Sequence, residues 1–225
     1  MLYLLDTGDV NHIKRAYDLY PLAGVTTNPT LIAREKADFL GMLTAIRGII
    51  GAGTMLHVQA VSRTAEGIVG EASYLAEKIG GHLYIKIPVI AEGIKAIKLL
   101  KERGIKTTAT AVFTPQQALM AAVAGADFVA PYVNRLDNIC GDGARVVSDI
   151  VELFKTYNLP ARVLAASFKN SEQVHQASLA GAHAVTVSPD ILDLLLSHPL
   201  TDSSVDQFVK DWEGFYGAGK LTSHV

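Results

Sequence analysis

Short apolar runs rich in β-branched residues alternate along the chain with longer segments in which apolar residues recur every three or four positions. The first pattern is typical of buried strands and the second of amphipathic helices. Eight strands are predicted, at Leu2–Leu5, Gly24–Thr26, Met55–Ala60, Leu83–Ile87, Thr107–Ala111, Phe128–Pro131, Arg162–Ala166 and Ala184–Val187. Each is followed by a predicted helix. Eight βα units in 225 residues predict one α/β domain, a (β/α)8 TIM barrel over residues 1–225, with an open doubly wound sheet as the alternative.

The helical period is clearest in the segment IAEGIKAIKLLKERG. Its predicted apolar stripe contains Ile90, Ile94, Ile97 and Leu100. Gly104 stands where this helix should stop. Two later segments, QALMAAVAGADFVAPYV and HQASLAGAHAVTVSPD, both pass from an Ala-rich helix through AGA into a β run, which indicates repeated modules in a ring. We therefore expect Gly125 and Gly181 to end their helices in the same way.

A further helix is predicted at residues 202–217, beyond the eighth βα pair. Its apolar residues at helical spacing are Val205, Phe208, Val209, Trp212, Phe215 and Tyr216. A barrel does not need a ninth helix to close. This helix must therefore cover either its own barrel or a neighbouring subunit, and its spacing leaves both alternatives open.

Composition narrows the class of protein. Hydrophobic residues make up 49% of the chain, enough for a substantial core. The net charge is −2 and neither sign forms blocks, so we expect no nucleic-acid or membrane surface. The single cysteine, Cys140, excludes an internal disulfide and favours a reducing, cytoplasmic setting. We also expect no processed leader, because the apolar run at the N-terminus stops at Asp6.

Lys86 interrupts the buried run LYIKIPV. Side chains alternate between the two faces of a strand, so Lys86 should share the inner face with Tyr84 while Ile85 and Ile87 face the helices. Desolvation lowers a lysine pKa, and an uncharged amine is the nucleophile that forms a Schiff base with a carbonyl compound. The alternative is a snorkelling or ion-paired lysine at a sheet edge, but a closed barrel has no edge.

Polar side chains stand at the ends of seven of the eight predicted strands, which in a barrel share one rim. They are Asp6, Thr26, Thr27, Asn28, Gln59, Lys86, Thr110, Tyr132, Asn134, Arg135, Ser167 and Lys169. Gln59, Thr110 and the phenol of Tyr132 could together hold a water that shuttles protons. Asp6 is the nearest candidate carboxylate, at a rim that it shares with Asn28. For Gln59 and Thr110, ordinary hydrogen bonding inside the barrel fits the spacing nearly as well.

A phosphate site is predicted just after the sixth and seventh strands, where Arg135, Ser167 and Lys169 stand. A guanidinium fork, a hydroxyl and an ammonium together suit a phosphate dianion, and barrels of this kind often bind phosphate nearby. A surface ion pair is the alternative for each basic residue taken singly.

Metal chemistry is not predicted. His82 and His183 each precede a strand and so belong to the opposite end of the barrel, while His57 is alone in its strand. Cys140 has no evident activating histidine, so a structural or incidental thiol is the better interpretation. We expect neither a metal nor an organic cofactor.

Six motifs carry a resemblance to a known family: LDTGDV, GVTTNPTLI, IKIPV, TATAVFTPQQAL, APYVNRLDN and LAASFKN. In this order they resemble the transaldolase family, and most closely its short branch, similar to fructose-6-phosphate aldolase. The resemblance implies that Lys86 forms a Schiff base with dihydroxyacetone or the ketose carbonyl, and that Asp6 and Asn28 contact substrate hydroxyls. It also implies ring-like pentamers that pair into decamers, with the C-terminal helix lying across a neighbour.

Two positions separate the branches of this family by resemblance. Transaldolases usually carry glutamate where this chain has Gln59 and phenylalanine where it has Tyr132, so these residues resemble the aldolase branch. Where transaldolases usually have arginine, this chain has Lys169, which cannot make a bidentate phosphate contact. The sequence thus predicts reversible cleavage of fructose 6-phosphate to dihydroxyacetone and glyceraldehyde 3-phosphate. Transaldolase is the nearest alternative, and a non-catalytic sugar-phosphate sensor ranks third.

Overall fold

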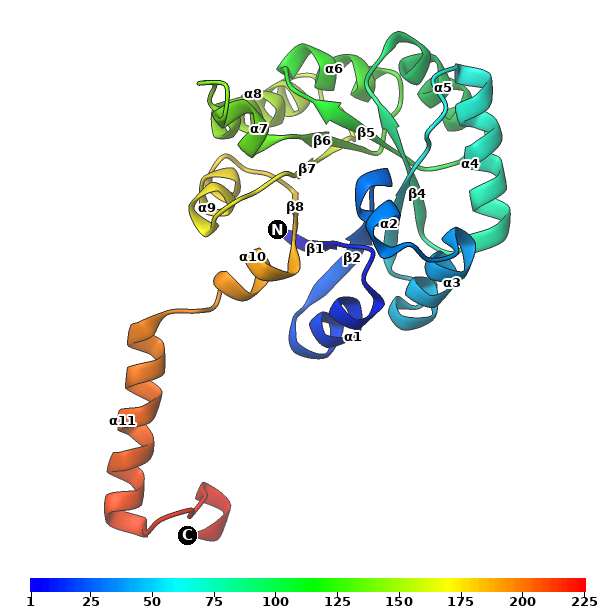
Figure 1. Ribbon diagram of the computed structural model, residues 1–225. Helices are drawn as coiled ribbons and strands as arrows, with labels where there is room; N and C mark the ends of the chain where they lie inside the picture. Colours follow the sequence, from blue (N-terminus) through cyan, green and yellow to red (C-terminus); the bar gives the residue numbers. More distant parts are fainter.

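Eight parallel strands close into a barrel in chain order, as Figure 1 shows for this computed structural model of residues 1–225. The strands are β1 (Leu2–Asp6), β2 (Leu22–Thr26), β3 (Met55–Gln59), β4 (Leu83–Pro88), β5 (Thr107–Val112), β6 (Phe128–Pro131), β7 (Arg162–Ala165) and β8 (Ala184–Val187). Every neighbouring pair is parallel, and β1 pairs with both β2 and β8. The predicted (β/α)8 barrel is confirmed, and the open sheet is excluded.

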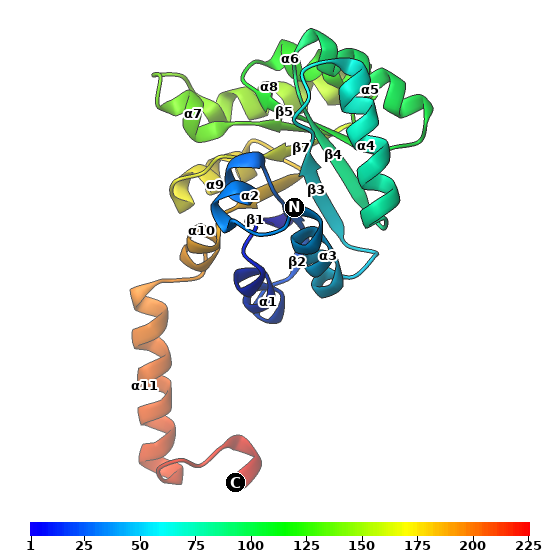
Figure 2. The ribbon, with the colours of Figure 1, turned by 45° about the vertical axis from the view of Figure 1, so that its right-hand side comes forward.

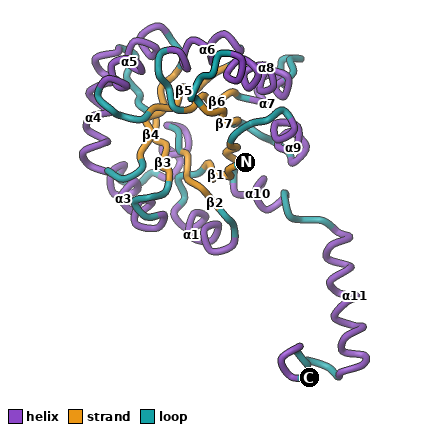
Figure 3. Tube along the Cα trace, turned by 180° about the vertical axis from the view of Figure 1, so that it is seen from behind, coloured by secondary structure: helices purple, strands orange, loops and turns teal.

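Helices surround the barrel on its outside (Figure 3). They are α1 (Val10–Leu19), α2 (Pro29–Glu35), α3 (Phe39–Ile50), α4 (Ala65–Ile79), α5 (Ala91–Glu102), α6 (Pro115–Val123), α7 (Val133–Asp137), α8 (Gly143–Thr156), α9 (Ser171–Leu179) and α10 (Pro189–Leu194). A further helix, α11 (Pro199–Tyr216), and a 3₁₀ turn at Thr222–His224 follow them along the chain. Gly104, Gly125 and Gly181 follow α5, α6 and α9 and have positive φ angles of 69°, 104° and 87°. Only glycine adopts this conformation freely, so the predicted helix ends are confirmed. No helix is both long and apolar enough to span a bilayer.

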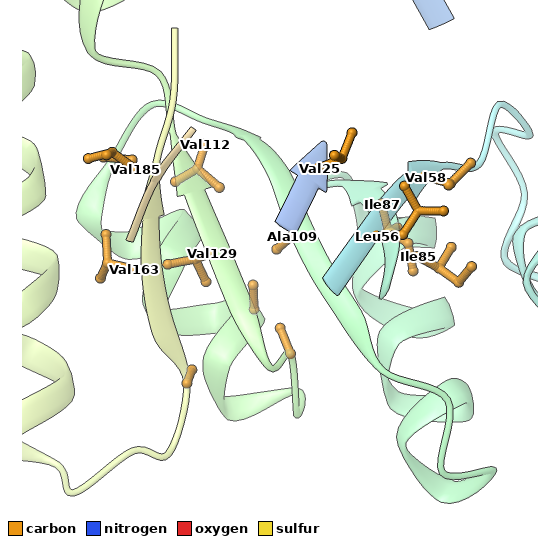
Figure 4. Close-up of a cluster of buried hydrophobic side chains, with 14 of the residues drawn as sticks. Val25, Leu56, Val58, Ile85, Ile87, Ala109, Val112, Val129, Val163 and Val185 are labelled. Atoms are coloured by element: carbon orange, nitrogen blue, oxygen red, sulfur yellow. The ribbon is translucent and has the colours of Figure 1, made fainter. Parts of the chain in front are cut away.

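Alternation along the strands builds two layers of core. One set of strand residues points outward against the helices, and Figure 4 shows members of this set such as Val58, Ile85, Ile87 and Val129. Ile85 and Ile87 are fully buried there, as predicted from strand parity. Burying a side chain of this size is worth about 1.5–3 kcal/mol, so the outer layer is a main source of the barrel's stability.

The inner layer fills the amino-terminal half of the barrel. Its apolar members are Leu4, Met55, Tyr84, Phe128, Leu164 and Ala184. The ring of His57 stacks on Tyr84, with centroids 4.5 Å apart, and meets Phe128 edge-on at 5.5 Å. We call these residues and His57 the aromatic plug. The cavity described below lies on the other side of it, toward the carboxyl ends of the strands.

The predicted apolar stripe of α5 is partly wrong. Ile90 is not inside the helix but caps it, and 44% of its surface is exposed. The buried face instead contains Gly93, Ala96, Ile97 and Leu100. A Cβ atom at Gly93 would lie 2.1 Å from the Pro88 carbonyl oxygen, so the helix start approaches β4 too closely for a large side chain. The stripe therefore shifts away from Ile90.

Helix α11 projects away from the barrel instead of packing on it (Figures 1 and 2). None of its residues is buried, and Phe208 and Phe215 are 69% and 83% exposed. The helix begins at Pro199, three residues before the predicted start, with His198 capping its first turn. Of the two alternatives left by its spacing, packing on its own barrel is therefore not observed.

Candidate functional site

A cavity of about 130 Å³ opens at the carboxyl ends of the strands. Eight of the twelve polar rim residues named from the sequence line it: Asp6, Thr26, Asn28, Lys86, Thr110, Tyr132, Arg135 and Ser167. They come from different strands and strand ends, because parallel strands in a barrel bring their ends to one rim. The structure thus brings these eight side chains to one cavity.

Lys86 lies deep in this cavity, with 6% of its surface exposed. Its Nζ donates a hydrogen bond of 2.7 Å to the Thr27 carbonyl oxygen and has no carboxylate partner within salt-bridge distance. Burial lowers the pKa of the Lys86 ammonium, while the negative charge of Asp6 raises it and so partly opposes this shift. The surroundings therefore favour the uncharged amine more than water does.

Thr110 on β5 forms a pair with Tyr132, the residue that follows β6. The Thr110 Oγ1 and Tyr132 hydroxyl lie 3.1 Å apart. Next to Thr110, Ala111 has a φ of 56°, and the register between β5 and β6 shifts at this point. A left-handed residue inside a strand is the mark of a bulge, which re-aims the side chains beside it. This bulge lies where Thr110 turns toward the phenol.

Three oxygen-bearing side chains form a chain on the side of the cavity made by β1, β2 and β8. Thr26 Oγ1 donates to Asp6 Oδ1 at 2.6 Å and lies 2.7 Å from Thr186 Oγ1. Nearby, Asn28 caps α2, since its Oδ1 accepts from the Leu31 amide at 3.0 Å. The Asn28 amide nitrogen donates to no protein group, so it is available to a bound molecule.

The predicted phosphate residues are only partly brought together. The Arg135 guanidinium carbon lies 4.8 Å from the centroid of the Tyr132 ring, and this arginine forms no salt bridge. Ser167 holds a left-handed backbone with φ of 64°, and its carbonyl accepts from the Asn134 amide at 2.8 Å. Lys169 is exposed and does not line the cavity. Two of the three groups thus face the cavity, and Lys169 lies outside it.

Gln59 also lies outside the cavity. It lines a neighbouring, mostly apolar groove of about 440 Å³ that includes Ile32, Phe39, Val61 and Tyr74. Its backbone pairs with that of Lys86, yet its side chain makes no hydrogen bond to Thr110 or Tyr132. Thr110 and Tyr132 thus line the cavity, whereas Gln59 lines the groove beside it.

Thr186 is a cavity residue that the sequence interpretation missed. The available signal was strand parity, because AVTV places Thr186 on the inner face with Ala184, while Val185 and Val187 join the outer core. The Thr27 carbonyl was also missed as the partner of Lys86. A backbone oxygen leaves no mark in a pattern of side chains.

The three histidines considered as possible metal ligands, His57, His82 and His183, do not come together. The His57 ring is fully buried, with Nδ1 2.9 Å from Thr108 Oγ1, and its pKa is lowered well below its ordinary value by burial and then by the charge of Lys86. His82 contacts Lys106, and His183 accepts from the Val163 amide, both beside strand starts. No group of three or more His, Cys, Asp or Glu residues is arranged to hold a metal ion.

The fold and cavity define an α/β barrel that buries a lysine among hydroxyl and carboxyl groups at the carboxyl ends of its strands. Residues 3–218 match the family described as Transaldolase/Fructose-6-phosphate aldolase, and the chain belongs to this family. Two relatives, each named "Probable transaldolase", come from Desulforudis audaxviator (strain MP104C) and Clostridioides difficile (strain 630). The first is 45% identical over 94% of this chain and 97% of its own, and the second 41% identical over 95% and 98%.

Solved structures resemble the barrel at much lower identity. One described as "Native KDPGal structure" aligns with a TM-score of 0.60 at 16% identity, over 95% of this chain and 94% of its own. A putative fructose-1,6-biphosphate aldolase from Coccidioides immitis aligns with a TM-score of 0.56 at 18% identity, over 99% and 81%. At these identities the likeness shows the fold alone, whereas the family assignment marks the chain as a transaldolase or aldolase type of enzyme.

Proposed function

We propose that the protein is a class I aldolase that reversibly cleaves fructose 6-phosphate to dihydroxyacetone and glyceraldehyde 3-phosphate. The observation that carries this proposal is the buried Lys86 amine, with a lowered pKa, in one cavity with Asp6 and the Thr110–Tyr132 pair. A binding protein needs no desolvated amine at this place. A Schiff-base enzyme does, because only the uncharged amine attacks a carbonyl.

In the proposed reaction, the Lys86 nitrogen attacks C2 of the ketose, and loss of water gives an iminium ion. Asp6 takes the proton of the C4 hydroxyl, the C3–C4 bond breaks, and the electron pair moves into the iminium to form an enamine. Glyceraldehyde 3-phosphate leaves. Tyr132, supported by Thr110, supplies a proton to C3, and water then hydrolyses the iminium to release dihydroxyacetone and the free amine.

Arg135 and Ser167 are the proposed partners of the substrate phosphate. Arg135 is exposed, lies over Tyr132 and lines the cavity without a protein counter-ion. An unpaired guanidinium at a cavity mouth is suited to a phosphate dianion. Lys169 joins this set only if its long side chain swings toward the mouth, so we propose that it contributes charge rather than a fixed contact.

Borohydride trapping tests the mechanism. With dihydroxyacetone and borohydride, the wild-type chain should gain one covalent adduct, located at Lys86 by peptide mass spectrometry. Lys86→Met should gain none, while Lys98→Met, which removes an exposed lysine of α5, should be trapped like the wild type. No adduct in the wild type, or an undiminished one in Lys86→Met, would sink the proposal.

Transaldolase is the second candidate, in which the bound dihydroxyacetone unit passes to an aldose phosphate. Relatives named "Probable transaldolase" and the position of Gln59 outside the cavity favour it. The Tyr132 hydroxyl in the cavity favours the aldolase, since a phenol can protonate the enamine without waiting for an acceptor. Glyceraldehyde 3-phosphate formation from fructose 6-phosphate should proceed without erythrose 4-phosphate. A strict need for this acceptor identifies a transaldolase.

A sugar-phosphate sensor is the third candidate, and Lys86→Arg separates it from both enzymes. A sensor should keep its affinity for fructose 6-phosphate in isothermal titration calorimetry after this change, whereas an aldolase or transaldolase loses all turnover because arginine stays charged.

We further propose that the chain is a homo-oligomer, a pentamer or decamer, in which α11, the helix expected from the sequence at residues 202–217, lies across a neighbouring subunit. The exposed apolar side chains of α11, Phe208 and Phe215 among them, support this. Sedimentation velocity should show the wild type as an oligomer and the double variant Phe208→Asp/Phe215→Asp as a smaller species. A wild-type monomer at micromolar concentration would contradict it. The cytoplasmic location stays a prediction of the sequence.

A further inference from the structure

We propose that Thr186 is a positioning residue, which orients the Thr26 hydroxyl toward Asp6 and so supports proton uptake by Asp6 during carbon–carbon bond cleavage. This inference rests on the proposed aldolase function and adds one residue to its proton-transfer step. It concerns a threonine on β8, the strand for which the sequence indicated no reactive group.

The barrel register brings the three side chains together. Asp6 on β1 pairs with Thr26 on β2, and on the other side of β1, Leu4 pairs with Thr186 on β8. Thr26 is fully buried, and Thr186 is 4% exposed. Both line the cavity with Asp6, so this chain of contacts borders the space in which a substrate would lie.

The number of available protons fixes which group donates in each hydrogen bond among Asp6, Thr26 and Thr186. A carboxylate only accepts hydrogen bonds, and a threonine hydroxyl has one proton to donate. The single Thr26 proton is used toward Asp6, at 2.6 Å. In the 2.7 Å contact between Thr26 and Thr186, the donor must therefore be Thr186. Both hydroxyls point their protons toward the carboxylate, an arrangement that strengthens each hydrogen bond through the next.

The donors and acceptors in these hydrogen bonds can exchange roles when Asp6 gains a proton. In the proposed cleavage, the O–H bond of the substrate C4 hydroxyl breaks and an O–H bond at Asp6 forms. The new carboxylic acid can donate to Thr26, whose hydroxyl then turns to donate to Thr186. The Thr186 proton turns into the cavity, toward the substrate. No covalent bond of either threonine changes, and the carboxyl group keeps a hydrogen-bond partner in both states.

A purely structural role is the competing explanation for a hydroxyl at this position. Valine has nearly the same shape as threonine, so Thr186→Val removes the donor with little change in packing. Thr186→Ser restores the donor, and Thr186→Ala provides a second way to remove it. Thr108→Val is the matched control, because Thr108 is a fully buried threonine on the inner face of β5 that bonds His57 and does not line the cavity.

The experiment compares two reactions of each full-length variant. Cleavage of fructose 6-phosphate needs the Asp6 step, whereas exchange of the dihydroxyacetone methylene protons with D2O, followed by NMR, needs Lys86 and the C3 proton donor only. In Thr186→Val and Thr186→Ala, kcat for cleavage should fall at least tenfold with KM within threefold, while proton exchange and borohydride trapping stay within twofold of wild type. Thr186→Ser and Thr108→Val should cleave within threefold of wild type.

Three outcomes would overturn the inference. They are cleavage at the wild-type rate in both Thr186→Val and Thr186→Ala, equal slowing of cleavage and exchange in both, or no rescue by Thr186→Ser. Failure of the underlying function looks different, because the wild type itself would then give no trapped adduct and no exchange.

Discussion

Replacing Lys86 by methionine should change how the stability of the barrel depends on pH. Burial lowers the pKa of the folded-state ammonium from its ordinary 10.5, so between the folded and unfolded pKa values the unfolded chain binds more protons. In that window the wild-type free energy of unfolding rises with pH, by up to about 1.4 kcal/mol per pH unit for one proton. The free-energy penalty of burying the Lys86 ammonium is therefore fully present below its folded-state pKa and is absent at pH values well above 10.5.

Methionine removes this penalty but introduces another. The Thr27 carbonyl loses its donor, Nζ at 2.7 Å, and an unsatisfied buried acceptor costs about 1–3 kcal/mol at every pH. The stability of Lys86→Met minus that of wild type should therefore be highest below the folded Lys86 pKa. It should then fall as pH rises, and settle at about −1 to −3 kcal/mol above pH 10.5.

Urea unfolding at a series of pH values from 6.5 to 11, at one protein concentration, measures this difference. Far-ultraviolet circular dichroism is the right signal, because the only tryptophan, Trp212, lies on α11 and reports that helix and not the barrel. Lys98→Met, on the exposed face of α5, should run parallel to wild type. Parallel curves for Lys86→Met and wild type would refute the idea of an amine held partly uncharged by burial.

Three further predictions follow from the same contacts. Ile85→Ala, at a fully buried outer-face position, should lower the free energy of unfolding measured by urea titration by about 2–5 kcal/mol. Ile139→Ala, at a position that is 73% exposed, should lower it by less than about 0.5 kcal/mol, and equal effects would contradict the described core. Tyr132→Phe keeps the ring under Arg135 but removes the hydroxyl bonded to Thr110. In a coupled assay, release of glyceraldehyde 3-phosphate without an acceptor should fall at least about tenfold, while transfer to erythrose 4-phosphate stays within about threefold. Equal losses of both activities would rule out the phenol as the distinguishing proton donor. Arg135→Ala should raise KM for fructose 6-phosphate by about 10- to 100-fold and KM for unphosphorylated fructose much less, and equal increases would show that Arg135 does not bind the phosphate.

Strand parity accounts for what could be predicted from the sequence. Alternation alone identified the inward position of Lys86 and the outward positions of Ile85 and Ile87, because a barrel strand has only two faces. The same rule applied to AVTV would have identified Thr186, although a threonine inside a strand is common and attracts less notice than a lysine. Parity is strong wherever the residue lies within a strand.

Strand ends are less predictable than strand interiors. Gln59 is the last residue of β3, and there the path of the following loop decides which space its side chain enters. Ile90 lies in the short connection between β4 and α5, where a shift of one residue moves it from the helix stripe to the cap. The hydrophobic periodicity of the sequence predicts neither outcome, since both depend on contacts between segments far apart along the chain.

The position of α11 was also beyond the sequence pattern. Its apolar spacing predicted the helix and an apolar face, and the structure contains both. A periodic stripe shows that something must cover it but carries no information on whether the partner belongs to the same chain.

The aromatic plug fills the amino-terminal half of the barrel, and the cavity opens at the carboxyl ends of the strands. Tyr84, Phe128 and the stacked His57 pack together in the barrel interior beneath Lys86. In the proposed reaction, substrate, leaving aldehyde and hydrolytic water would therefore use this opening in turn. If the proposed imine forms, a molecule held on Arg135 would control when water reaches it, and therefore whether the bound fragment is released or transferred to a second aldehyde.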